Sequence, residues 1–212
     1  MSRLLMIRHG ETAHNADGRL STAAPGGPLT DLGLEQAERL AETLATTPLE
    51  AVYTSPLIRA RQTADAIARR QGLSAIPRAD LAEISTGELD GRADDEAFDV
   101  LNRALDAWCQ CEYEVRIGRD GDLGTDVCRR FGELVEEVAR RHPLRPVALV
   151  SHGGLLQVGV SSLAENLPPG FALRRFIRNT GIVELECVGG RVRCLSWEGA
   201  EPATLVKTER RV

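Results

Sequence analysis

Short apolar runs that alternate with helix-like stretches constrain the fold of this chain most strongly. Residues 4–7 (Leu-Leu-Met-Ile) and 146–150 (Pro-Val-Ala-Leu-Val) are continuous apolar runs, typical of strands buried on both faces of a sheet. Residues 51–54 fit a further strand and residues 75–76 a short one. Because helix-like patterns separate these strands, the sequence predicts an α/β fold with a central, mostly parallel sheet covered by helices.

Capping signals and apolar periodicity predict where the helices begin. Thr30 is placed to cap a helix that has Asp31 in its first turn. Ser55 followed by Pro56 predicts a second start, with the serine as N-cap. Thr125 is the expected cap of a helix with a regular apolar stripe. Further elements are expected at about 96–109 and from about 155 (helices), and at 182–185 with 192–197 (a hairpin).

Composition excludes several classes of protein. Of the 212 residues, 42% are hydrophobic and 27% are charged, an ordinary globular mixture that excludes a disordered or fibrous chain. No apolar run approaches the roughly 20 residues that a membrane span needs. A net charge of −5 argues against nucleic-acid binding. We therefore expect one domain over residues 1–212, with neither nucleic acid nor membrane as a partner.

The cysteines and the basic residues suggest the compartment and the origin. All five cysteines follow residue 100, and Cys109 and Cys111 lack the second pair or nearby histidine that a zinc site needs. Residues 1–8 turn polar too early for a signal peptide. Lys207 is the only lysine, as in proteins encoded by GC-rich bacterial genomes. We expect a bacterial, cytoplasmic protein with reduced thiols and no metal site.

Two histidines follow the two strongest predicted strands. His9 and His152 each precede a glycine and follow a strand end, where ligands bind in open α/β sheets. Arg8 precedes the first histidine, and Arg59 lies in the first turns of a predicted helix. Because a guanidinium fork fits phosphate oxygens, these side chains and Asn15 predict a phosphate pocket. The other two histidines lack the glycine and are interpreted as structural.

Residues 8–12 (Arg-His-Gly-Glu-Thr) with Asn15 resemble the signature of the histidine phosphatase superfamily, which has the phosphoglycerate mutase-like fold. Four further segments, in order along the chain, are similar to motifs of that family: 29–33, 53–64, 81–84 with Gly87 and Gly91, and 150–154. Together they cover most of residues 3–160. The chain is identified as a member of the phosphatase branch, which implies a three-layer α/β/α sandwich with a lid-like insertion at about 84–124.

The resemblance also implies a role for each matching residue. The catalytic residues would be His9 (nucleophile), Glu83 (general acid and base), Arg8, Arg59 and His152; the phosphate and substrate contacts would be Arg8, Asn15, Thr22, Arg59, His152 and Gly153. Imidazole suits the first role because it is largely neutral near pH 7 and needs no separate base. No metal and no cofactor are implied, because cationic side chains replace the usual Mg²⁺.

The implied function is a metal-independent phosphatase that hydrolyses a small phosphorylated metabolite through phosphohistidine. One alternative is a cofactor-dependent phosphoglycerate mutase, whose middle segment is longer and rich in Arg and Pro; residues 93–125 here hold no proline. A non-catalytic phosphate-binding regulatory module and a protein phosphatase acting on phosphohistidine or phosphotyrosine also stay open. So does the oligomeric state, with a homodimer as one option.

Overall fold

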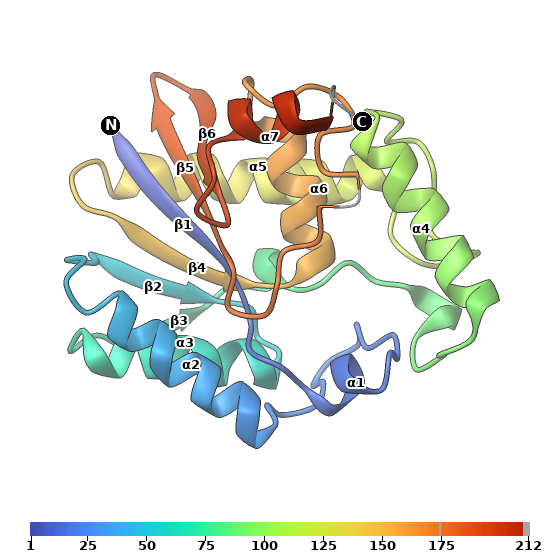
Figure 1. Ribbon diagram of the computed structural model, residues 1–212, viewed down its shortest axis with the longest axis horizontal. Helices are drawn as coiled ribbons and strands as arrows, with labels where there is room; N and C mark the ends of the chain where they lie inside the picture. Colours follow the sequence, from blue (N-terminus) through green and yellow to red (C-terminus); the bar gives the residue numbers. More distant parts are fainter. Residues whose placement is uncertain (174, 210–212) are drawn as a thin grey trace.

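Six strands form one central sheet with helices on both sides (Figure 1). The structure is a computed structural model that describes residues 1–173 and 175–209. The strands are β1 (Ser2–Arg8), β2 (Ala51–Thr54), β3 (Ala75–Pro77), β4 (Val147–Ser151), β5 (Ile182–Val188) and β6 (Arg191–Trp197). The α-helices are α1 (Ala13–Ala16), α2 (Asp31–Thr43), α3 (Ile58–Arg70), α4 (Asp95–Cys109), α5 (Gly124–Arg141), α6 (Gly153–Leu163) and α7 (Pro202–Glu209), with short 3-10 helices η1 (Ala79–Leu81) and η2 (Gly87–Leu89).

The strand order is β3-β2-β4-β1-β5-β6, so β4 lies between the first two strands of the chain. The four strands β3, β2, β4 and β1 are parallel, whereas β5 pairs antiparallel with β1 and with β6. The prediction of a mostly parallel sheet with a C-terminal hairpin is therefore confirmed. Gly189 and Gly190 make the hairpin turn at φ 58° and 81°, values that glycine adopts without strain.

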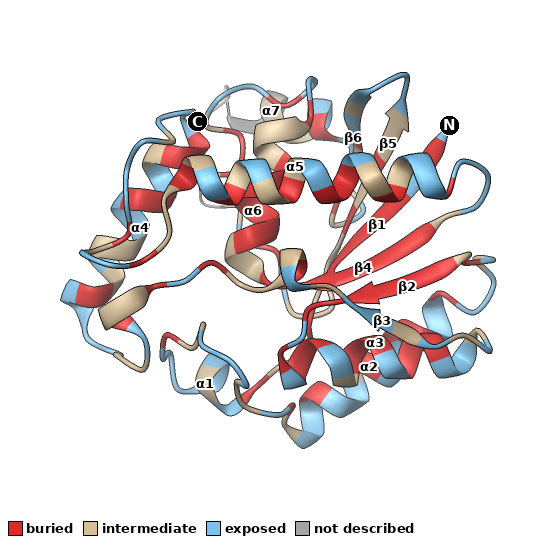
Figure 2. Ribbon diagram, turned by 180° about the vertical axis from the view of Figure 1, so that it is seen from behind, coloured by how far each residue is buried: buried red, intermediate tan, exposed pale blue. Residues whose placement is uncertain are grey.

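Alternate residues of β1 face opposite layers, which explains its continuous apolar run. Leu4 and Met6 pack with residues of α5 and α6, whereas Leu5 and Ile7 pack with residues of α2 and α3. Each face of the strand thus joins its own hydrophobic cluster, and the central strands are buried along their length (Figure 2). The result is the three-layer α/β/α sandwich expected from the sequence.

One helix begins where its capping signal predicts and two do not. Thr30 caps α2, and its hydroxyl accepts a hydrogen bond from the Gly33 amide at 3.0 Å. The predicted N-cap Ser55 is wrong, because α3 begins only at Ile58; the serine hydroxyl accepts from the Leu57 amide at 3.3 Å and also bonds His152. The predicted cap Thr125 is also wrong: Leu123 precedes α5, and the Thr125 amide donates to the Tyr113 carbonyl. At Ser55 the hydroxyl is shared with a tertiary contact, whereas at Thr125 the backbone amide makes the contact.

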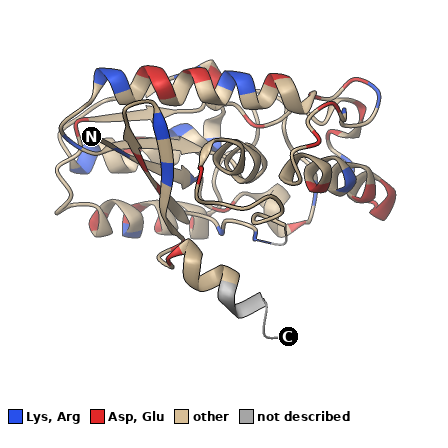
Figure 3. Ribbon diagram, turned by 90° about the horizontal axis from the view of Figure 1, so that it is seen from above, with Lys and Arg blue, Asp and Glu red and all other residues tan. Residues whose placement is uncertain are grey.

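Acidic and basic side chains are interspersed along the outer helices (Figure 3). Exposed ion pairs of opposite sign join neighbouring turns, as between Glu35 and Arg39 of α2. In that view the basic residues do not gather into the stripe that is typical of nucleic-acid binding. In the part of the chain that the structure describes, every helix is too short or too polar to cross a bilayer.

Candidate active site

The carboxyl ends of β1 and β4 lie side by side because the two strands are parallel and in register. Arg8 is the partner of Ser151, and the His9 amide donates to the Ser151 carbonyl at 3.0 Å. The residues that follow the strands, His9 and His152, therefore meet, with ring centroids 5.1 Å apart and planes at 62°. The structure thus brings together two side chains that are more than 140 positions apart in the sequence.

The environment of His9 fixes its tautomer. Its Nδ1 lies 2.6 Å from the Gly10 carbonyl oxygen, which only accepts, so Nδ1 carries the proton and Nε2 keeps its lone pair. That lone pair accepts a hydrogen bond from Arg59 Nε at 3.0 Å. Burial, followed by the charge of Arg59, lowers the pKa of His9 well below its usual value. The ring is therefore a neutral imidazole with a nucleophilic nitrogen.

Two guanidinium groups lie at this end of the sheet, that of Arg59 buried and that of Arg8 half-buried. Arg8 Nη1 donates to the Ile177 carbonyl at 2.7 Å, and Arg59 Nη2 donates to the Ser21 carbonyl at 3.0 Å. Burial lowers the pKa of both arginines, while the carboxylate of Glu83 acts in the opposite direction. Two cations held this close out of water favour an anion between them.

Three buried nitrogen atoms at this end of the sheet have no hydrogen-bond partner among the described residues: Arg8 Nε, Arg59 Nη1 and His152 Nδ1. Leaving a buried donor unpaired costs about 1–3 kcal/mol, and more for a charged group. An oxyanion with several acceptor oxygens removes that cost at all three positions. The three positions are therefore able to donate to an oxyanion.

His152 is fully buried at the start of α6, where it occupies the N-cap position. Its Nε2 lies 2.7 Å from the hydroxyl oxygen of Ser55. With the serine hydroxyl assigned as the donor to Nε2, the single ring proton of the imidazole lies on Nδ1. Burial, and then the charges of Arg59 and Arg8, lowers the pKa of His152 well below its usual value. Ser55 therefore positions an imidazole rather than starting a helix.

Glu83 follows η1 and lies on the amino end of α6. Its Oε1 accepts from the amides of Ile84 at 2.9 Å and Leu155 at 2.8 Å, and its Oε2 accepts from the Gly154 amide at 3.2 Å. A Cβ atom at Gly154 would lie 2.7 Å from Ile84 Cδ1 and 3.0 Å from Glu83 Oε1, which explains the glycine. The helix amino end thus fixes a carboxylate in the wall of the cleft.

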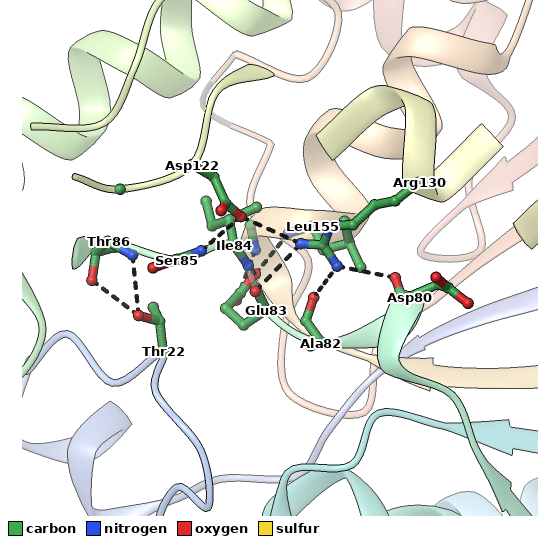
Figure 4. Close-up of polar contacts among 12 residues, drawn as sticks. Thr22, Asp80, Ala82, Glu83, Ile84, Ser85, Thr86, Asp122, Arg130 and Leu155 are labelled. Atoms are coloured by element: carbon green, nitrogen blue, oxygen red, sulfur yellow. Dashed lines mark hydrogen bonds and ion pairs between the residues drawn. The ribbon is translucent and has the colours of Figure 1, made fainter. Parts of the chain in front are cut away.

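The loop that carries Glu83 is held from α5 (Figure 4). Arg130 donates to the carbonyls of Asp80 at 3.1 Å, Ala82 at 2.7 Å and Glu83 at 3.4 Å. Its guanidinium also lies 3.6 Å from Asp122, which accepts from the Ser85 amide at 2.9 Å. One arginine therefore ties together the backbone on both sides of the acid.

The remaining predicted contacts lie around the same cleft. Asn15 lines it, but its Oδ1 also accepts from the Thr12 amide at 3.2 Å in the capping box of α1. The Thr22 hydroxyl donates to Asp90 at 2.9 Å and accepts from the Thr86 amide at 3.2 Å, joining the first loop to the acid loop (Figure 4). Gly153 lines the cleft beside Arg8.

The cleft has a volume of about 530 Å³ and includes residues that sequence reasoning missed. Its outer wall comes from α4 and from the segment before β5. Among the missed residues are His14, Phe98, Leu101, Asn102, Leu105, Gln157, Phe176, Ile177 and Asn179. His14 was interpreted as structural and yet lines the cleft. The α4 side chains recur at helical spacing, a pattern identical to that of an ordinary core stripe. Among the described residues, no group of three or more His, Cys, Asp or Glu side chains is placed to hold a metal ion.

The three-layer fold holds this cationic cleft at the carboxyl edge of its parallel strands, an arrangement suited to an anionic ligand. Comparison with known proteins then gives the family. The chain belongs to the histidine phosphatase superfamily (branch 1), whose model matches residues 4–199. The family and its phosphatase-named members support a phosphoric monoester hydrolase.

Two curated relatives and one solved structure illustrate the similarity. The chain is 31% identical to a metal-independent phosphoserine phosphatase of Arabidopsis thaliana, over 74% of this chain and 66% of that protein, just under two thirds of its length. It is 33% identical to a glucosyl-3-phosphoglycerate phosphatase of Mycolicibacterium vanbaalenii, over 76% and 73%. A mycobacterial glucosyl-3-phosphoglycerate phosphatase solved with VO₃ superposes with a TM-score of 0.81 at 28% identity, covering 93% of this chain and 99% of that one.

Proposed function

We propose that this chain is a metal-independent phosphatase of a small phosphorylated metabolite, that it works through a phosphohistidine at His9, and that it acts in a bacterial cytoplasm. The unpartnered donors of Arg8, Arg59 and His152 around His9 Nε2 are the observation that carries this proposal. They are hydrogen-bond donors without an acceptor, placed where the equatorial phosphoryl oxygens would lie. The five free cysteines fit a reducing compartment.

In the first step, His9 Nε2 attacks phosphorus in line with the leaving oxygen. Arg59 Nε, which donates to that nitrogen in the free protein, transfers its hydrogen bond to a phosphoryl oxygen. The new P–N bond forms as the P–O bond to the substrate breaks, and Glu83 gives a proton to the departing alkoxide. The alcohol leaves, and the phosphoryl group stays on the histidine.

In the second step, water attacks the phosphohistidine from the position that the alcohol vacated. Glu83, now deprotonated, takes a proton from that water as the new P–O bond forms and the P–N bond breaks. Inorganic phosphate leaves and His9 returns to its neutral form.

Residues 84–124, which carry α4 and one wall of the cleft, form the lid of the single domain in this proposal.

A quench experiment tests the intermediate. The protein is mixed with a ³²P-labelled alkyl phosphate, and the quenched protein is assayed for acid-labile, base-stable label, which is mapped to a peptide. We expect the label on the peptide that contains His9, none in His9→Ala, and normal labelling in His142→Gln, a histidine outside the cleft that bonds Tyr53 at 2.9 Å. Wild-type labelling of His9→Ala would refute the assignment.

The same preparation separates hydrolysis from mutase chemistry. A phosphatase releases inorganic phosphate in proportion to alcohol, whereas a mutase isomerises a phosphoglycerate and needs a bisphosphate primer. Primer-dependent isomerisation without phosphate release would favour the mutase.

A further inference from the structure

The cleft has two chemically different halves. The inner half holds Arg8, His9 and Arg59, which the proposed function assigns to the phosphoryl group. The outer half lies against α4 and the segment before β5, and its large side chains are apolar: Ile84, Phe98, Leu101, Leu105, Phe176 and Ile177. Since the phosphoryl group occupies the inner half, the outer half faces the alcohol part of the substrate.

Several of these apolar side chains are incompletely buried. Phe176 is 63% exposed although it lines the cleft, and Phe98 and Leu101 are half-buried while packed against the main core cluster. Phe98, Leu101 and Leu105 follow one another at helical spacing, so a single face of α4 supplies them. Apolar surface left open inside a cleft marks a place where a ligand removes it from water.

The polar groups of the outer half are mostly uncharged. Among the described residues that line it, the amides of Asn102, Gln157 and Asn179 supply hydrogen bonds without charge. Gln157 already donates to the Ala172 carbonyl at 2.8 Å. The ionisable side chains that line the cleft outside the phosphoryl site are Arg19, whose guanidinium donates to the Gly91 carbonyl, His14 and Glu83, the last assigned to proton transfer. At the apolar wall itself, a carboxylate on the substrate alcohol would lose its hydration.

We infer that the substrate is the phosphomonoester of a neutral alcohol that carries an apolar ring, an inference that rests on the proposed function. The ring lies between the face of α4 that bears Leu101 and the exposed side chain of Phe176. Stacking and burial of the ring supply its binding free energy, and the amide side chains bond neutral polar groups at its edge. An amino-acid or hydroxy-acid phosphate lacks the ring and adds charged groups that these apolar side chains cannot solvate.

Three substrates with alkyl leaving groups test the inference: 2-phenylethyl phosphate, ethyl phosphate and O-phosphoserine. We expect kcat/KM for the phenylethyl ester to exceed that for the ethyl ester by roughly 10–100-fold, from about 100 Å² of ring surface buried in part. O-Phosphoserine should be the poorest of the three. Equal values for the ring-bearing and ethyl esters, or a preference for O-phosphoserine, would overturn the inference.

A binding arm keeps this test independent of catalysis. Calorimetry with 2-phenylethylphosphonate and ethylphosphonate, which carry P–C bonds that are not hydrolysed, measures the ring preference directly. If the phosphonates show that preference but no ester is hydrolysed, the proposed function fails and the inference about the wall stands. Equal Kd values for the two phosphonates would overturn the inference whatever the turnover.

Variants locate the preference in the wall. Phe176→Ala should lower the ratio of the phenylethyl to the ethyl kcat/KM about tenfold, and Phe176→Tyr should restore it, because an aromatic ring suffices. The control is Leu144→Ala, an apolar residue that is 88% exposed and lies outside the cleft. Its ratio should match that of the wild type. An unchanged ratio in Phe176→Ala would place the alcohol elsewhere.

Discussion

Replacement of Glu83 by glutamine tests the proposed proton donor. The carboxylate holds three backbone hydrogen bonds, two on Oε1 and one on Oε2. Oε2 is therefore the oxygen with room to carry a proton. A glutamine keeps the Oε1 bonds but turns an NH₂ group toward the Gly154 amide, at a cost of about 1–3 kcal/mol in stability. A domain with 5–15 kcal/mol of stability tolerates that loss, so the variant should fold.

The kinetic effect should depend on the leaving group. An alkyl phosphate expels a strongly basic alkoxide, so Glu83→Gln should slow phosphorylation of His9 by roughly 10²–10⁴-fold. That factor corresponds to about 3–5 kcal/mol of transition-state free energy. Nitrophenolate leaves without a proton, so nitrophenyl phosphate should phosphorylate the variant at nearly the wild-type rate. Rapid-quench measurements of the first turnover with both esters provide the comparison.

Equal slowing with both esters would refute proton donation by Glu83. The carboxylate would then act by electrostatics or positioning, and Glu88 or Asp90 of the same loop would become the candidate donor. In the structure both are engaged: Glu88 accepts from the Arg119 amide at 2.9 Å, and Asp90 accepts from the Thr22 hydroxyl at 2.9 Å. Glu83 is engaged as well, but it lines the cleft, whereas Glu88 and Asp90 do not, and this position favours Glu83 as the donor.

Turnover should persist in EDTA and be inhibited by vanadate, which mimics five-coordinate phosphorus; activity that is lost on chelation and restored by Mg²⁺ would contradict the cationic side-chain mechanism. Burial, with the charges of neighbouring side chains, lowers the pKa of His9 and His152, so the unfolded chain takes up protons below about pH 6.5 that the native chain does not. The free energy of unfolding should therefore fall between pH 6.5 and 5.5, by up to about 1.4 kcal/mol per pH unit for each histidine, and urea titrations that show an increase would exclude this linkage. Arg130→Met should lower Tm and should slow hydrolysis of the alkyl ester more than that of the nitrophenyl ester. Arg129→Met, on the exposed face of α5, should change neither Tm nor the two rates. Equal effects of the two substitutions would show that Arg130 does not position Glu83.

The layers of the fold were predictable because their signals are local. A short apolar run such as residues 4–7, bounded by polar residues, fits a strand covered on both faces, and Thr30 with its helix obeys ordinary capping rules. The ends of β1 and β4 could also be placed together, since parallel strands share a carboxyl edge. Sequence reasoning therefore reached the positions of His9 and His152 in the fold.

The outer cleft and two helix starts were not predictable from local patterns. Ser55 has the same local signal whether its hydroxyl caps a helix or bonds His152, and only the tertiary structure decides between the two. Likewise, Leu101 belongs to a stripe that looks like core from its spacing alone. The hydrogen bonds from Arg130 to the acid loop span about 50 positions, and no periodicity in the sequence marks them.

The placement of β4 ties the site to completion of the chain. β4 pairs with β1 on one side and β2 on the other, although it follows both by more than 90 residues. During synthesis the first two strands therefore wait for a central partner, and His9 and Arg59 stay without the strand that aligns them until residue 151 has emerged. Such long-range pairing slows folding, and a chain interrupted before β4 carries His9 and Arg59 but no assembled cleft. Strands β5 and β6 and cleft residues such as Ile177 come later still, so the cleft is complete only after most of the sequence has emerged.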